Sequence, residues 1–452
     1  MLLSILAFLA LSGPLLLYTF GYRFSLSNFD IHKTGGVFAH TNPSGTNITI
    51  NDTQRTTSYL TGNAFIQNLR PGSYTAEITR KGYQTWEKTI DVEPQTVIEL
   101  FPVLMPNTPV IIALQTASST RMSASPNASI LILHQEKNSR HLYEFFDPET
   151  RVPLLMNTPS QTLMASVPPN AHWRWNAEEM EAVIETPDNW LLFTRQGNTI
   201  RVQSLYRTTS LAKLFPKKPR ALVPDPRNKN HYFLLDGTDF VRWNTQTKKA
   251  QQLLQSIGGF FVSNAQLILW DTQSSIPYIT SLDATQARPF ATTSVASVSN
   301  ARIEETNGRL LLSGNTDLWL WENSASTPSL LTDSLTPEHI LHTNAYILWW
   351  DEKTINIYWT GADSELPSFQ KIRKETIYES DGHIQQVVPY PQEQYLILQE
   401  DNVMYTLELD GRGEMRTKQI VYKGENPSFH ASPGEKTMYV LDDGALFAIE
   451  LP

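Results

Sequence analysis

The chain has 452 residues, too many for one ordinary hydrophobic core, so two or more folded units are expected. It contains no cysteine, which excludes disulfides, thiolate metal sites and cysteine nucleophiles, and its formal net charge of −9 argues against general nucleic-acid binding. Polar and aromatic residues are plentiful, and long segments with helical periodicity are missing. This composition favours an all-β fold made of many short strands.

The N-terminal segment is apolar and uncharged over residues 2–20, LLSILAFLALSGPLLLYTF. As a helix it would span about 28 Å, close to the hydrocarbon thickness of a bilayer. Tyr22 and Arg23 follow as an interfacial collar. We therefore predict a transmembrane anchor over residues 1–23, with the bulk of the chain extracytoplasmic at the cell membrane. The alternative is a signal peptide cleaved near Gly13. The charges flanking the span do not define its orientation.

The next segment, residues 31–105, is a series of short alternating runs separated by turns. Asn42-Pro43-Ser44-Gly45 has the composition of a turn, and NITIN (47–51) alternates apolar and polar residues. The run TWEKTIDVEP places four side chains on one face: Trp86, Lys88, Ile90 and Val92. The pattern predicts a small β-sandwich in which large aromatics such as Trp86 contribute much of the buried apolar area.

Two strings in this segment, PSGTNITIND and LRPGSYTAEITRKGYQTWEKTIDVEP, resemble the PEGA domain family over about residues 35–105. Ser44 and Thr46 stand where the family name has Glu and Ala, but Pro43 and Gly45 keep the turn. The resemblance implies a bacterial or archaeal envelope or surface protein. It does not imply catalysis, and it assigns no site residues.

The remainder, residues 108–452, contains a repeated pattern of a strand, a turn and an aromatic-rich strand, with a spacing of about 44 residues. The copies begin at Ser125, Trp175, Asp225, Ser263, Thr306, Thr343, Tyr390 and Ser432. Loops such as SPNAS and SPGEK resemble those of WD40-like and TolB-like β-propellers. We predict a propeller of about eight blades, or seven if one copy is an insertion. Residues 109–116 are expected to supply the strand that closes the ring.

No catalytic, metal-binding or cofactor-binding motif is present, so no catalytic residue, metal ligand or cofactor is predicted. His339 and His342 are three residues apart, but they precede a strand and are expected to split between its faces or to bond to the backbone. Glu178, Glu179 and Glu181 are expected to form a solvated loop. Five tryptophans near the later copies are expected to pack between blades rather than to bind sugars: Trp319, Trp321, Trp349, Trp350 and Trp359.

One segment is basic within this acidic chain. Residues 195–249 contain 12 Lys and Arg against 3 Asp and Glu. Within it, FPKKPR holds Lys217, Lys218 and Arg220 between prolines in an extended loop. These three residues are the candidate binding site for an anionic partner, either lipid headgroups or an acidic cell-wall polymer. The alternative is that strand alternation scatters the charges over several faces.

The sequence therefore predicts a membrane-anchored extracytoplasmic binding or scaffold protein of the cell envelope. Its propeller would present a face to an unidentified envelope protein or polysaccharide, and nucleic acid is not expected. The alternative is an envelope hydrolase or lyase with its site in the propeller channel. Converging carboxylates or histidines in the channel would favour the enzyme, whereas backbone and small polar groups would favour binding.

Overall fold

The computed structural model describes residues 12, 22–25, 30–51, 53–116, 119, 121–138, 140–169, 171–175, 179–207, 211–263, 265–295, 298, 301–306, 308–323, 327–335, 339–360, 373–390, 394–431 and 436–452. The predicted anchor therefore lies almost entirely outside the described residues. The last two residues of the predicted anchor, Tyr22 and Arg23, are not part of a helix. They belong to β1 (Tyr22–Ser25), which pairs with β2 (Asp30–Lys33). No helix within the described part is long and apolar enough to cross a membrane.

The first unit is a two-layer sandwich. One layer has the order β6-β3-β9 and the other has the order β5-β4-β7-β8. The strands are β3 (Gly35–His40), β4 (Asn47–Ile50), β5 (Thr53–Thr56), β6 (Asn63–Leu69), β7 (Gly72–Thr79), β8 (Trp86–Val92) and β9 (Val97–Leu100). Asn51 and Gly45 both have positive φ, as their predicted turns require. The predicted sandwich and its hairpin tip are confirmed.

The core of the sandwich lies between its two layers. Strand β8 alternates strictly between buried and exposed residues, and Trp86 is fully buried together with Ile90 and Val92. Ala76 and Ile78 of β7 face the same core. Lys88 is also buried on this face, as the alternation predicted, although a lysine is seldom found in such a place.

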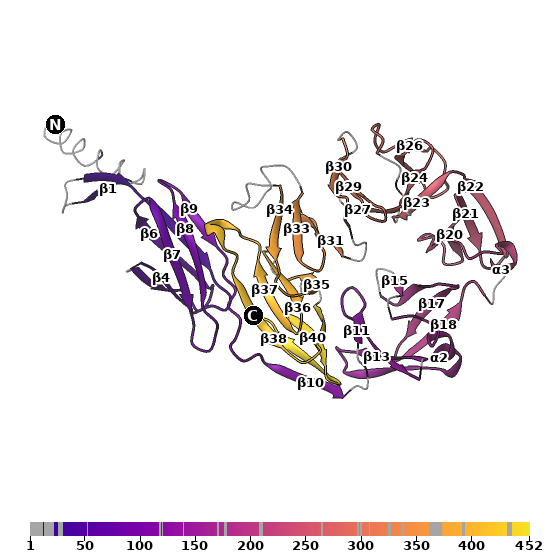
Figure 1. Ribbon diagram of the computed structural model, residues 1–452, viewed down its shortest axis with the longest axis horizontal. Coiled ribbons are helices and arrows are strands. Elements are labelled where there is room, and N and C mark those ends of the chain that lie inside the picture. Colours follow the sequence, from indigo (N-terminus) through magenta and orange to yellow (C-terminus); the bar gives the residue numbers. More distant parts are fainter. Residues whose placement is uncertain are drawn as a thin grey trace.

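The second unit is a ring of antiparallel sheets (Figure 1). Blade 1 is β11 (Arg121–Ala124), β12 (Leu131–Lys137), β13 (Arg140–Asp147) and β14 (Val152–Met156). Blade 2 is β15 (His172–Trp175), β16 (Glu181–Thr186), β17 (Asn189–Gln196) and β18 (Thr199–Ser204). Blade 3 is β19 (Ala221–Pro224), β20 (His231–Asp236), β21 (Asp239–Asn244) and β22 (Lys249–Leu254). Blade 4 is β23 (Ile257–Val262), β24 (Gln266–Asp271), β25 (Ile276–Ser281) and β26 (Arg288–Pro289).

Blade 5 is β27 (Arg302–Thr306), β28 (Arg309–Ser313), β29 (Leu318–Trp321) and β30 (Ser329–Thr332). Blade 6 is β31 (Ile340–His342), β32 (Tyr346–Trp350), β33 (Thr354–Trp359) and β34 (Lys374–Glu379). Blade 7 is β35 (Ile384–Pro389), β36 (Tyr395–Glu400), β37 (Val403–Glu408) and β38 (Lys418–Lys423). Blade 8 is β39 (Ser428–Ala431), β40 (Thr437–Asp442) and β41 (Ala445–Glu450), completed by β10 (Ile111–Thr116). Each predicted copy supplies the two middle strands of one blade.

The ring closes through the strand that the sequence predicted. Strand β10 pairs antiparallel with β41, so the first and last strands of the propeller share blade 8. Strand β11 lies against β39, and a hydrophobic cluster joins blades 8 and 1. Blades 1 and 2 are further joined by the parallel pairing of β14 with β18, which the sequence did not predict. The short helix α2 (Thr158–Met164) packs against β18 and β13 at this junction.

Large apolar side chains hold neighbouring blades together, as expected for a propeller. Hydrophobic clusters lie between successive blades around the ring. Trp321, Trp349, Trp350 and Trp359 are buried in these clusters, and Trp319 packs against one of them. The prediction that these tryptophans belong to the core is confirmed.

Candidate functional site

The predicted basic site does not form one free cationic surface. The loop containing it follows α3 (Leu211–Leu214). Of its three cations, Lys217 and Arg220 are exposed and Lys218 is partly buried. The Lys218 ammonium donates to the Thr186 carbonyl at 2.6 Å and lies 4.6 Å from the centre of the Trp190 ring. The Arg220 guanidinium donates to the Gly258 carbonyl at 2.7 Å. Two of the three cations therefore have partners within the ring, and binding of an anionic polymer there stays a prediction.

A buried ionic contact joins the sandwich to blade 7. The Lys88 ammonium lies 2.9 Å from the Glu408 carboxylate and 3.5 Å from the Asp410 carboxylate, and all three side chains are almost completely buried. Lys88 also donates to the Asp410 carbonyl oxygen. Burial raises the pKa of Glu408, and the ammonium of Lys88 opposes that rise.

A second cation completes this network from the propeller side. Arg412, in the short helix η2 (Arg412–Glu414), donates to both oxygens of Asp410 and to the Glu99 carbonyl of the sandwich at 2.6 Å. The two carboxylates are thus paired with two cations, Lys88 from the sandwich and Arg412 from the propeller. Gly413 has φ of 75°, and a Cβ there would lie 2.1 Å from the Thr89 carbonyl oxygen. The backbones of η2 and β8 therefore approach too closely for any other residue.

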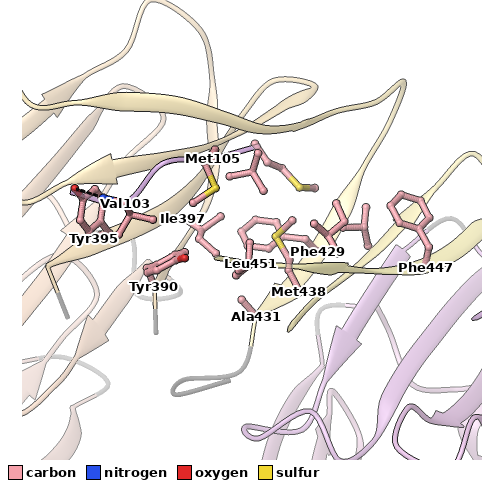
Figure 2. Close-up of a cluster of buried hydrophobic side chains, with 14 residues drawn as sticks. Val103, Met105, Tyr390, Tyr395, Ile397, Phe429, Ala431, Met438, Phe447 and Leu451 are labelled. Atoms are coloured by element: carbon pink, nitrogen blue, oxygen red, sulfur yellow. Dashed lines mark hydrogen bonds between the residues drawn. The ribbon is translucent and has the colours of Figure 1, made fainter. Parts of the chain in front are cut away.

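The segment that connects the two units is also fixed to blades 7 and 8. Val103 and Met105 pack among the buried side chains of these blades, and the Val103 N–H donates to the Tyr395 hydroxyl at 3.2 Å (Figure 2). The Met105 N–H donates to the Gln419 side chain at 2.7 Å. Nearby, the Gln84 amide bonds both the N–H and the C=O of Ile420 on the outer strand β38. The Gln84 side chain therefore occupies the backbone hydrogen-bonding groups of Ile420 at the edge of β38, as a neighbouring strand would.

These contacts place the sandwich against the outside of the ring at its C-terminal blades, as Figure 1 also shows. Residues 34–108 match the PEGA domain family. The sandwich is a PEGA domain. The stretch around Gly82 and Trp86, which carried the resemblance in the sequence, therefore has two roles. It closes the core of the PEGA domain, and through Gln84 and Lys88 it makes the contact with blade 7.

Comparison with solved structures finds propellers at low sequence identity. The C-terminal WD40 domain of Sif2 aligns over 76% of this chain and 99% of its own, with 10% identity and a TM-score of 0.44. The propeller domain of Cps50 (Swd1) from Myceliophteria thermophila aligns over 76% of this chain and 100% of its own, with 10% identity and a TM-score of 0.38. No curated protein matches the chain. The propeller assignment rests on the strand pairing of this chain.

The histidine pair lies at the inner side of the ring but does not converge. His342 is on β31, and its Nδ1 lies 2.9 Å from the Glu304 carboxylate on β27 of the neighbouring blade. The hydrogen bond to Glu304 raises the pKa of His342, against the opposing effect of burial. His339 instead stacks on Trp350, with ring centres 5.2 Å apart. Within the described residues, no group of three potential ligands could hold a metal ion.

The acidic cluster near residue 180 differs from the expected solvated loop. Glu179 is buried, and its carboxylate accepts hydrogen bonds of 2.6 Å from the hydroxyls of both Ser125 and Ser129. Burial by itself would raise the pKa of Glu179, but these bonds and the Asn127 N–H outweigh it and lower the pKa. The expectation was wrong because the SPNAS loop of blade 1 supplies donors that a solvated loop would lack. Glu179 therefore ties blade 2 to blade 1, and Glu178 lies outside the described residues.

Proposed function

We propose that this protein is a membrane-anchored binding or scaffold protein of the cell envelope. The PEGA domain holds the propeller in a defined orientation, and the propeller presents its face to an envelope protein or polysaccharide. The carrying observation is the buried contact of Lys88 with Glu408 and Asp410. A flexible spacer would not need a buried ionic network, because removing charges from water is costly unless their geometry is defined.

The position of the PEGA domain supports the same proposal. It follows the apolar N-terminal segment directly in sequence and is docked on the propeller through blade 7. An anchor at residues 1–23 would therefore orient the whole ring relative to the membrane and not only the domain next to it. Binding modules that recognise partners from a surface benefit from such preorganisation, since less orientational freedom is lost on binding.

Two experiments test the location. The full-length chain is expressed in bacterial cells with an epitope tag at the C-terminus, and the membranes are extracted with carbonate. We expect the protein to stay in the membrane fraction, and we expect protease added to spheroplasts to remove the tag while leaving a cytosolic marker intact. Release of the protein into the soluble fraction would contradict the anchor. A tag protected from the protease would contradict the extracytoplasmic location.

The binding role is tested with a fragment that comprises residues 30–452. We expect it to cosediment with purified envelope fragments in a saturable manner. A variant that undocks the PEGA domain, Lys88→Met, should retain the binding face but lose the defined orientation, so cosedimentation in solution should persist. Absence of saturable binding, together with turnover of an envelope polysaccharide that is lost in Glu304→Gln, would instead favour the alternative of a hydrolase or lyase in the channel.

A further inference from the structure

Arg174 lies on the inner strand of blade 2, flanked by two tryptophans. Trp173 and Trp175 stack with ring centres 5.5 Å apart and pack against the cluster between blades 1 and 2. Because successive side chains of a strand point to opposite faces, Arg174 points to the other face of β15, toward blade 3. Its cross-strand neighbour Val183 belongs to the cluster between blades 2 and 3, in agreement with this direction.

Arg174 differs from the other interior arginines in lacking a partner. Arg195, Arg309 and Arg412 each hold a carboxylate, at Asp147, Glu322 and Asp410 respectively. The Nε of Arg174 is buried and has no hydrogen-bond partner, and no ion pair joins its guanidinium to any described residue. The side chain as a whole is only partly buried, but a buried donor without an acceptor is costly, so its presence needs a reason other than stability.

The charges around Arg174 do not compensate it. Burial lowers the pKa of Arg174, Arg302 lowers it further, and Glu185 and Glu304 act in the opposite direction. Both of these carboxylates already have other partners: Glu185 accepts from the Lys218 ammonium at 3.3 Å, and Glu304 from the His342 ring at 2.9 Å. Figure 1 shows β15 and β27 on the inner side of the ring, where Arg174 and Arg302 therefore lie. The inner side of blade 2 thus carries a cation that forms no ion pair with any described residue.

We propose that the inner side of the ring binds an anionic group of a ligand, a carboxylate or a phosphate, with Arg174 as its main contact and Arg302 as a second cation. The planar guanidinium donates two parallel hydrogen bonds to either group, and such bonds are stronger where water is excluded. The inference deepens the proposed function by naming the chemistry that the propeller recognises, and it rests on the propeller being a binding module. It also separates binding from the exposed loop at Lys217, where two of three cations have internal partners.

The test uses the protein as residues 30–452, with inorganic phosphate and acetate as probes at constant ionic strength in chloride. We expect at least one probe to raise the thermal unfolding temperature of the wild type in a saturable manner, and calorimetry to give a matching dissociation constant. In Arg174→Met, binding should be about 10- to 100-fold weaker, since a hydrogen bond to a charged group is lost. The exposed Arg55→Met serves as the matched control and should bind as the wild type does.

A second expectation follows from the missing partner. In buffer without phosphate or carboxylate, Arg174→Met should be at least as stable as the wild type, because a buried donor without an acceptor has been replaced by an apolar side chain. If Arg174→Met does not fold, Arg302→Gln, whose side chain is exposed, should weaken binding several-fold. Absence of a saturable response in the wild type, or an equal response in the variants, would overturn the proposal. Saturable binding in a protein that fails the carbonate and protease tests would keep this site and reject only the envelope location.

Discussion

Lys88 and Arg174 are both cations on strands that pack within the fold, but their surroundings are opposite. Lys88 has two carboxylates and a carbonyl oxygen within reach, and Arg412 balances the remaining negative charge. Arg174 has carboxylates in its neighbourhood that are already bound to Lys218 and His342. The first cation is satisfied by the fold itself, whereas the second is left for something outside the chain.

This difference distinguishes a charged residue that stabilises the fold from one that is available to bind a ligand. A buried ion pair adds little net stability compared with an apolar contact of the same size, but it penalises every other arrangement of its partners. At the PEGA contact it therefore specifies one docking geometry. An unpaired buried charge specifies no geometry within the chain, and its cost is offset only when an anion arrives. Four predictions test or sharpen this comparison.

The largest effect is expected from Trp86→Ala. Trp86 is fully buried in the PEGA core on the same strand face as Lys88, with the Lys88 ammonium 6.0 Å from its ring centre. Removing the indole should cost about 3–5 kcal/mol in the free energy of unfolding of the PEGA domain. Denaturant unfolding of residues 30–452 measures it. Tyr59→Ala, which removes a 77% exposed aromatic of the same domain, is the control and should change little.

Lys88→Met should have the next largest effect, with the opposite sign to Arg174→Met. Removing the ammonium leaves Glu408 buried without its counter-charge, while Asp410 keeps Arg412, and the cost should be about 3 kcal/mol. Lys81→Met, on the exposed hairpin turn of the same domain, is the matched control. Limited proteolysis between residues 100 and 110 should also become faster in Lys88→Met, because the PEGA domain undocks. Equal stability of the Lys88 and Lys81 variants would mean that the network does not hold the domains together.

Gly413→Ala isolates the close approach of the two backbones. Gly413 and Gly308 have nearly the same positive φ, 75° and 77°, but only Gly413 faces a neighbouring carbonyl within 4 Å. Alanine at Gly308 should cost about 1–2 kcal/mol from the backbone conformation alone. Gly413→Ala should exceed this cost, because the Thr89 carbonyl must move and the docking contact must open. Thermal unfolding of the two variants compares them directly, and equal losses would argue against tight docking at η2.

The sequence predicted the local strands well because their alternation depends only on neighbouring residues. The face that contains Trp86 and Lys88, the copies that form the blades and the closing strand β10 were all deducible in this way. The partners of Lys88 were not, since Glu408 and Asp410 are more than 300 residues away and no local pattern marks them. The available signal was a lysine on an apolar face, which requires a counter-charge somewhere in the fold.

The site residues were harder to predict for a related reason. Lys217, Lys218 and Arg220 stand out by composition, but composition does not show that the ring provides carbonyl acceptors for two of them. Arg174 does not stand out by charge at all. Its signal is an arginine between two tryptophans in the string HWRW, where alternation places it opposite the aromatic face. Whether such an arginine has a partner depends on neighbouring blades, which only the structure brings together.

The smallest predicted effect concerns His342, which also lies on an inner strand but, unlike Arg174, has a partner, Glu304. The bond to Glu304 raises the pKa of His342 in the folded state. The stabilisation is therefore fully present below the unfolded-state pKa of about 6.5 and is lost as the pH rises through the folded-state pKa. His342→Gln should consequently be less stable than the wild type at acidic pH and should approach it at alkaline pH. The difference should stay below about 1 kcal/mol, because both side chains are partly exposed to solvent.

Denaturant unfolding across this pH range measures the difference in stability between the wild type and His342→Gln. Glu304→Gln should abolish the same pH-dependent difference. A gap between wild type and His342→Gln that does not change with pH would show that the pair contributes packing rather than charge.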